Sequence, residues 1–451
     1  MEQKKAGSAT TAYKLRLYDR HLDWIKNTAD LYNQIVEFYY KLLLEQQELL
    51  ELDNYKLLRQ LEILTIGTRQ MKAEGKEIEY SLNQFLKNKT TKPPIYFRRA
   101  AINQAISLIR SYKTRYSIWE EKVQAGQENF NTNMPKETEI FRTHPVFYKG
   151  MYRDFTATSI QLKLFNGKKW IWITYPYTGR DFPKEGKILS PFLKVYRKTA
   201  YLHVPVETVV QDIRTVNERM ETEKRICAVS FPDHDNLAVC AIMTKEGILV
   251  DSLFIHGGNT RESQRREILL KLQKSRKSRK GSGREIKNLK GEVSKENAVL
   301  LKKLEQINEY YAHQISRKIL NYCIEKEIKV IIVPNYGKSI DFQGKQYLNT
   351  NRYRWQGRAI IHNLKYKAFK EGIIVTTIPP YHISDCCSIC EEKIRRYNEG
   401  HRASKDYYGG RLFICPNGHQ GNTALNTAKN IGKYFLRRFQ KVSLEEENRN
   451  D

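Results

Sequence analysis

The feature that most limits the fold of this chain is a group of sulfur ligands near its end. Cys387 and Cys390 form a CxxC pair, and 24 residues separate the pair from Cys415, which opens the segment Cys-Pro-Asn-Gly-His ending at His419. Zinc prefers four soft or borderline ligands in a tetrahedron, and cysteines on tight turns supply them at the right spacing. The sequence therefore predicts a small zinc ribbon with Cys387, Cys390, Cys415 and His419 as ligands.

The role expected of this zinc is structural, because four protein ligands leave no open position for a reactive water. Cys386 stands beside a ligand and is the substitute if His419 does not bind. The remaining cysteines, Cys227, Cys240 and Cys323, are expected to be buried small hydrophobes. An odd total of seven, with four of them clustered, suits metal ligation in a reducing cytoplasm better than a disulfide framework.

The charge of the chain restricts its partners. The 451 residues carry 78 Lys and Arg against 50 Asp and Glu, a net charge of +28. Such an excess favours a polyanion as partner, since each neutralised phosphate releases counterions. No apolar run is long enough to span a membrane, and the first residues lack the apolar region of a secretory signal. We therefore expect a cytoplasmic nucleic-acid-binding protein without a membrane partner.

The first half combines helices with period-two strands. A strand is expected near Ala12–Tyr18, and helices are expected from Asp19 toward Glu51, over Tyr55–Gln70, and after Pro93-Pro94. In the last of these helices, apolar and aromatic positions are expected to form a buried stripe: Ile102, Ile109, Tyr112, Tyr116 and Trp119. Residues 159–165 and 170–175 read as a hairpin with a type I′ turn at Asn166-Gly167, and residues 192–196 and 201–206 as a second strand pair. Together these strands predict a small barrel around a helical insertion.

The second half alternates apolar strands with helices. Strands are expected over residues 226–229, 237–243, 248–255, 329–333 and 373–378, and helices over 294–325 and 359–371. This order predicts an α/β sheet domain. The fold class is therefore mixed α+β and multidomain.

Two basic segments are candidate nucleic-acid contacts. One lies on the polar face of the helix after Pro94 and comprises Arg98, Arg99, Asn103, Gln104, Arg110 and Lys113. The other lies in residues 261–290, where twelve Lys and Arg face three acidic residues, and its candidates are Arg276, Lys277, Arg279, Lys280 and Arg284. Simple solvation of a charged face is the competing interpretation for both segments.

Several motifs resemble one family. The stretches TIPPYHISDCCSIC and FICPNGHQGNTALNTAKNI, together with YKAFKEGIIV and FRRAAINQAISLIRSYKTRY, are similar to those of TnpB (OrfB-type) transposon proteins and miniature type V CRISPR effectors. The resemblance implies a wedge barrel, a helical recognition domain, an RNase H-like (RuvC) domain and a zinc ribbon. It assigns 1–18 and 141–208 to the barrel, 19–140 to recognition, 209–380 to the RuvC-like domain with a basic helical insertion, 381–420 to the ribbon, and 421–451 to the end of the RuvC-like domain and a tail.

The resemblance also shows what is missing. Family members cut DNA with three carboxylates that hold two divalent metal ions. Where the family motif reads G-I-D-L-G this chain has Ser230 for the Asp. Pro334 replaces the Glu of I-I-V-E, and Ala424 replaces the Asp of A-D-L-N-A-A. A displaced site could draw on Asp233, Asp235 or Asp341. No carboxylate lies between Asp406 and Glu445, so the third motif has no neighbouring substitute and no catalytic Mg²⁺ is expected.

These observations imply a prokaryotic, nucleoid-associated, RNA-guided and nuclease-dead DNA-binding protein. Its expected partners are a guide RNA and double-stranded target DNA, which it would hold as an R-loop beside a short flanking motif. It would then regulate transcription, chiefly by repression, through occupancy or by recruiting RNA polymerase or another protein. The alternatives are an active guided endonuclease with a displaced metal site and a guide-free transposition accessory protein.

Overall fold

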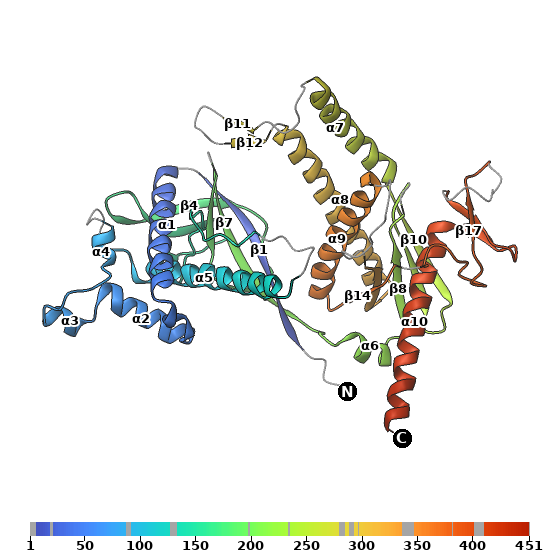
Figure 1. Ribbon diagram of the computed structural model, residues 1–451, viewed down its shortest axis with the longest axis horizontal. Coiled ribbons are helices and arrows are strands. Elements are labelled where there is room, and N and C mark those ends of the chain that lie inside the picture. Colours follow the sequence, from blue (N-terminus) through green and yellow to red (C-terminus); the bar gives the residue numbers. More distant parts are fainter. Residues whose placement is uncertain are drawn as a thin grey trace. The chain divides into compact units, whose positions relative to one another are not determined.

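The computed structural model describes residues 6–18, 21–86, 92–126, 133–196, 199–232, 235–278, 285–287, 293–295, 297–335, 347–380, 382–400 and 410–450. The chain forms two compact units (Figure 1). The N-terminal unit is Thr10–Thr208, and the C-terminal unit is Val209–Asp451 with Met1–Ala9.

The N-terminal unit contains one curved sheet in the order β2-β3-β4-β1-β7-β5, with β6 also paired to β7. Its strands are β1 (Gly7–Leu17), β2 (Tyr152–Arg153), β3 (Ser159–Phe165), β4 (Trp170–Thr178), β5 (Lys187–Ile188), β6 (Phe192–Val195) and β7 (Ala200–Val210). In β3, Ile160, Leu162 and Leu164 are buried and alternate with polar residues, as period two requires. Residues 145–147, just before β2, hydrogen-bond to β6 through the bridge between Val146 and Phe192. The segment then continues into β2, which pairs with β3, so hydrogen bonds link the two ends of the sheet as expected of a small barrel.

The hairpin of β3 and β4 is present, but its predicted turn type was wrong. Phe165 pairs with Trp170, which leaves four residues in the loop. Gly167 has φ +98°, whereas Asn166 is not among the residues with positive φ. A type I′ turn needs positive φ at both central residues. Instead, the side chain of Asn166 accepts hydrogen bonds from the backbone N–H groups of Lys168 and Lys169.

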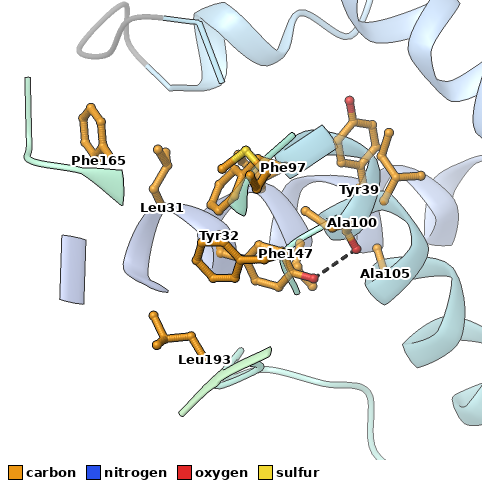
Figure 2. Close-up of a cluster of buried hydrophobic side chains, with 14 of the residues drawn as sticks. Leu31, Tyr32, Tyr39, Phe97, Ala100, Ala105, Phe147, Phe165 and Leu193 are labelled. Carbon is orange, nitrogen blue, oxygen red and sulfur yellow. Dashed lines mark hydrogen bonds between the residues drawn. The ribbon is translucent and has the colours of Figure 1, made fainter. Parts of the chain in front are cut away.

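Among the helices of this unit, the first lies against the sheet and packs along the last. The helices are α1 (Leu22–Glu45), α2 (Asn54–Ile66), α3 (Arg69–Ala73), α4 (Leu82–Phe85) and α5 (Ile95–Gln124), with a 3₁₀ turn η1 (Gln47–Glu51). Figure 2 shows the centre of the core, where the Tyr32 hydroxyl donates to the carbonyl of Ala100 at 3.0 Å and its ring meets Phe97 edge-on. This bond satisfies a polar group that would otherwise be costly to bury.

The stripe predicted on α5 is buried only in its first half. Ile102 and Ile109 are fully buried, but Tyr112, Tyr116 and Trp119 remain partly exposed. The three rings contact one another along the helix, with centroids 6.2 and 5.5 Å apart. Periodicity predicts that residues share a face, but only tertiary contacts decide how far that face is covered.

The C-terminal unit contains a mixed five-stranded sheet in the order β10-β9-β8-β13-β14. The strands are β8 (Arg225–Ser230), β9 (Asn236–Thr244), β10 (Leu249–His256), β13 (Val330–Pro334) and β14 (Ile374–Ile378), and α6 (Val216–Thr222) precedes the first of them. β8, β9 and β10 are antiparallel neighbours, whereas β8, β13 and β14 run parallel. This arrangement confirms the expected α/β sheet domain.

Alternate residues of the sheet face different helices. Cys227 and Val229 belong to the core that includes residues of α8 (Ala298–Glu325) and α9 (Tyr347–Lys370). Ile226 and Ala228 belong to the core that includes residues of α10 (Thr423–Asn450). Cys227, Cys240 and Cys323 are all fully buried in the first core, so their prediction as small hydrophobes is confirmed.

The remaining elements are α7 (Gly258–Ser278), the short pair β11 (Glu285–Lys287) and β12 (Val293–Lys295), and the ribbon strands β15 (Arg395–Tyr397), β16 (Leu412–Ile414) and β17 (Gln420–Asn422). The first part of the basic run 261–290 therefore forms a helix. Arg276 and Lys277 lie in α7, while Arg279, Lys280 and Arg284 fall outside the described residues. Within the described ranges, no helix has the length and apolarity needed to cross a bilayer.

Candidate functional site

Ser230, Pro334 and Ala424, the three positions where the sequence motifs lack an expected carboxylate, lie at one edge of the C-terminal sheet. Ser230 ends β8 and Pro334 ends the parallel strand β13. Ile332 pairs with Ala228, so Pro334 and Ser230, each two residues further on, lie level and on the face toward α10. Ala424 lies in the first turn of α10, and the Ser230 hydroxyl donates to its carbonyl at 2.8 Å.

Ser230 and Ala424 meet although they lie far apart in the chain. Residues 194 positions apart in the chain are in direct contact at the edge where the carboxyl ends of parallel strands meet. The side chains there are a hydroxyl, a pyrrolidine ring and a methyl group. None carries the hard anionic oxygen that a divalent magnesium ion prefers.

Among the acids proposed for a displaced site, only Asp235 lies within the described residues; Asp233 and Asp341 lie outside them. The Asp235 carboxylate accepts a hydrogen bond from Asn259 and forms an ion pair with Arg411. Asp235 therefore serves as an anchor for the segment that leads into β16.

The predicted metal ligands do come together. The ligand atoms of Cys387, Cys390, Cys415 and His419 all lie within 4.8 Å of one another. The sulfurs of Cys390 and Cys415 are 3.6 Å apart, and Nδ1 of His419 lies 3.4 Å from the Cys415 sulfur. Three thiols and an imidazole form the donor set of a tetrahedral structural zinc site, so the residues fit this ion.

The local backbone explains this arrangement. The segment 415–419 turns tightly: Gly418 donates to the Cys415 carbonyl at 3.0 Å, and Cys415 donates to the His419 carbonyl at 2.9 Å. Gly418 has φ +80°, a conformation that glycine adopts without steric cost. A backbone hydrogen bond involving Glu392 lowers the pKa of the Cys390 thiol to about 6, which favours the thiolate form that binds metal.

Cys386 is not part of the ligand group. Its sulfur lies 3.2 Å from the carbonyl of His382, and burial raises the pKa of its thiol. Its own carbonyl accepts hydrogen bonds from Asn426 and Asn430. The geometry therefore brings His419, and not Cys386, to the fourth position.

A polar face of α10 fixes the ribbon to the sheet domain. Asn426 accepts a hydrogen bond from the Ser388 backbone at 2.8 Å, and Lys433 donates to the Ser388 carbonyl. Asn430 donates to the carbonyl of Ile383 at 2.9 Å. This contact was not predicted from the sequence. The spacing of Asn426, Asn430 and Lys433, at i, i+4 and i+7 of an amphipathic helix, was a signal that could have indicated it.

The basic residues of α5 take part in contacts within the N-terminal unit. Arg98 and Arg99 share the carboxylate of Glu62 at 2.9 and 2.8 Å. Burial alone would raise the pKa of Glu62, but the hydrogen bonds from these arginines lower it below its usual range. Asn103 donates to the Tyr148 hydroxyl at 2.9 Å.

Beside these residues lies a cavity of about 540 Å³ whose lining includes Arg59, Arg98, Arg99 and Asn103. Its arginines outnumber its one acid, Glu62. Gln104 is half-buried, Arg110 donates to Asn54, and Lys113 is half-buried. The role of the α5 residues in nucleic-acid binding stays a prediction.

The fold and the site together define a class: a mixed α/β protein whose C-terminal sheet domain carries, against its last helix, a ribbon with three cysteines and a histidine that fit a zinc ion. Residues 358–431, which include the four ligands and Ala424, match the family model of the Cas12f1-like TNB domain. Residues 9–166 match the Aq_aa04 family. The first of these matches lies within the segment whose motifs predicted a resemblance to TnpB proteins and miniature type V effectors.

Solved structures with a similar arrangement include a Cas12f1–sgRNA–target DNA complex, at 15% identity, with 91% of this chain and 81% of that chain covered and a TM-score of 0.46. Another is C2c1 of Alicyclobacillus acidoterrestris with single-guide RNA, at 12% identity, 90% and 69% coverage and a TM-score of 0.45. A third is the mini-RNA-guided endonuclease Cas_phi3, at 8% identity, 97% and 92% coverage and a TM-score of 0.45. No protein of curated function matches the chain.

Proposed function

We propose that this protein is an RNA-guided DNA-binding protein that has lost nuclease activity and regulates transcription, chiefly by repression. The observation that carries the proposal is the convergence of Ser230, Pro334 and Ala424 at one sheet edge with no carboxylate among them. Two divalent ions in a nuclease centre are held mainly by carboxylates, whose charge offsets that of the metals. Replacement of all three removes that charge.

The contact between Ser230 and Ala424 supports a structural role for this edge. The hydroxyl of Ser230 donates at 2.8 Å to the carbonyl of Ala424 in the first turn of α10. In the family that the motifs resemble, a metal-binding aspartate is expected at the position of Ser230. An aspartate at this position would bring a negative oxygen toward the Ala424 carbonyl. The edge thus joins β8 to α10 in the proposed protein and holds no catalytic magnesium.

Binding of nucleic acid does not depend on those carboxylates. The net charge of +28 provides long-range attraction to phosphates, and the arginine-rich cavity beside α5 offers a local site for them. Solved structures of similar arrangement include complexes with single-guide RNA and, in one case, target DNA. We infer the same classes of partner here, with the R-loop acting by occupancy or by recruitment of another protein such as RNA polymerase.

The first test is purification of the protein from its own host, followed by sequencing of the bound RNA. One abundant RNA with a variable guide end is expected, and the complex should bind a matching duplex in a gel-shift assay. The complex should leave a matching plasmid uncut in Mg²⁺. Guide-dependent cuts would support the displaced-site nuclease, and absence of any specific RNA would support a guide-free accessory protein.

Restoring the carboxylates is a sharper test of how cleavage was lost. In the triple variant Ser230→Asp, Pro334→Glu and Ala424→Asp, Mg²⁺-dependent nicking is expected to rise from none to a detectable rate. The single variant Ser230→Asp should stay inactive and should melt at a lower temperature, because it removes the donor to Ala424. Cleavage by the unaltered chain at the rate of the triple variant would contradict the proposal.

The basic run can be tested through salt dependence. Neutralising Arg276, Lys277, Arg279 and Lys280 to Gln should lower the slope of log K against log salt by up to about 3–4, since each lost phosphate contact removes about 0.7–0.9. The matched control replaces four lysines exposed elsewhere. An unchanged slope would show that the run is only solvated.

A further inference from the structure

Three rings lie in a row across one face of the N-terminal sheet. His144 stacks on Phe192 with centroids 6.1 Å apart and an interplanar angle of 14°, and Phe192 stacks on His203 at 4.9 Å and 18°. Phe192 pairs with His203 in the neighbouring strand β7, and on its other side it bridges to Val146. These three residues form what we call the ring row.

The ring row lies on the face of the sheet opposite the core. In β7, Ala200, Leu202 and Val204 are buried, and the residues between them, Tyr201 and His203, are only partly covered. Side chains alternate between the two faces of a strand, so Tyr201 and His203 point away from the core. Phe192 and Lys194, their partners in β6, share that face.

Lysines are interleaved with these rings. The Lys14 ammonium lies 3.9 Å from the centroid of the Tyr201 ring and 5.8 Å from that of Tyr196, and the two tyrosines meet edge-on at 5.4 Å. Lys194 is paired with Tyr201 across the strands. A surface on which aromatic faces alternate with cations suits single-stranded nucleic acid, whose bases stack while its phosphates meet the charges.

The charges around the two histidines all have the same sign. Burial lowers the pKa of His144, and Lys194 lowers it further. For His203, burial acts first, followed by Lys194, Lys14 and His144. Within the described residues, no carboxylate offsets these effects at either ring, and Nε2 of His203 is buried without a hydrogen-bond partner.

We propose that this face binds single-stranded nucleic acid, with bases on Tyr196 and on the outer face of His144 and phosphates at Lys14 and Lys194, and that binding takes up protons at His144 and His203. The inference rests on the proposed function, for which it names one contact surface. A phosphate beside the histidines supplies the missing negative charge and raises their affinity for protons. Protons bound on association make the affinity rise as the pH falls.

The test uses the full chain freed of co-purified RNA and a fluorescent 15-nucleotide oligouridine. Its anisotropy is titrated between pH 6 and pH 8 at fixed salt. We expect the unaltered chain to bind about tenfold more tightly at pH 6 than at pH 8, since one proton linked over one pH unit changes affinity by up to about tenfold. His144→Phe with His203→Phe keeps aromatic rings but cannot take up protons, and should lose most of that dependence.

Two further variants make the test specific. Phe192→Leu removes the ring that holds the imidazoles of His144 and His203 parallel, and it is expected to weaken binding about tenfold at every pH, as loss of one base stacked on His144 would. His256→Phe alters an exposed histidine of the C-terminal unit and should leave the pH dependence unchanged. Melting curves of each variant confirm that it is folded.

The inference falls if the double phenylalanine variant keeps the full pH dependence, or if Phe192→Leu binds as tightly as the unaltered chain. Either result leaves the proposed function intact, provided that the natural complex still binds its target. The opposite outcome can also be recognised. If the protein purified from its host carries no guide RNA but shows both the pH dependence and the effect of Phe192→Leu, the binding surface is supported and the proposed function is contradicted.

Discussion

Replacing Cys390 with serine is expected to abolish zinc binding and to unfold the ribbon. The Cys390 sulfur lies 3.6 Å from that of Cys415 in a group of four ligand atoms within 4.8 Å. Structural zinc contributes about 10–16 kcal/mol to the folding of isolated zinc-finger peptides, so a ribbon this small should not persist without it. Metal analysis of the purified protein should fall from one zinc per chain to none.

The neighbouring residues provide the controls. Cys386→Ser should keep its zinc, because the Cys386 sulfur lies against the His382 carbonyl and outside the ligand group. His419→Ala should lose zinc or bind it far more weakly. The ligand assignment would be wrong if Cys386→Ser lost the metal while His419→Ala retained it.

Replacing Arg219 with methionine is expected to destabilise the C-terminal unit by about 3–5 kcal/mol, the usual cost of breaking a buried ion pair. The guanidinium is 1% exposed and forms an ion pair with Asp212 at 3.3 Å. It also donates to the carbonyls of Gly372 at 2.8 Å, Asp212 at 2.9 Å and Arg214 at 3.1 Å. Methionine fills much of the volume but leaves three carbonyls without their donor.

Urea unfolding measures this loss in the free energy of unfolding. Hydrogen exchange of the β14 amides measures it locally, because Gly372 lies in the turn that leads into β14. Arg219→Lys should recover only part of the stability, because a single ammonium cannot reach three carbonyls as a planar guanidinium does. Arg225→Met, at the exposed start of β8, is the matched control and should change stability by less than about 0.5 kcal/mol. Equal effects at residues 219 and 225 would show that the buried network is dispensable.

Local patterns predicted most of the regular elements. The period-two run SIQLKLF became β3, and the apolar run KVIIV became β13. The CxxC pair and the later Cys-Pro-Asn-Gly-His segment named the ligands that the structure brings together. These features depend on residues close in the chain, where spacing alone sets which side chains share a face or a turn.

Patterns that depend on distant neighbours were predicted less well. The stripe of α5 loses its cover after Ile109, and the turn at Asn166 is set by its side chain rather than by two residues of positive φ. The sequence predicted Arg98 and Arg99 as nucleic-acid contacts, with a solvated face as the competing interpretation, whereas in the fold both arginines form ion pairs with the carboxylate of Glu62 on α2.

The sequence by itself predicted a polyanion-binding protein with a zinc ribbon and without the carboxylates of the family that its motifs resemble. Those conclusions follow from composition, ligand spacing and residue identity, none of which needs coordinates. Only the tertiary structure decided that Ser230 and Ala424 touch, that α10 holds the ribbon through Asn426, and that His144 and His203 flank one phenylalanine. Such contacts join residues far apart in the chain, and packing of the sheet and its helices, which no local pattern encodes, brings them within reach.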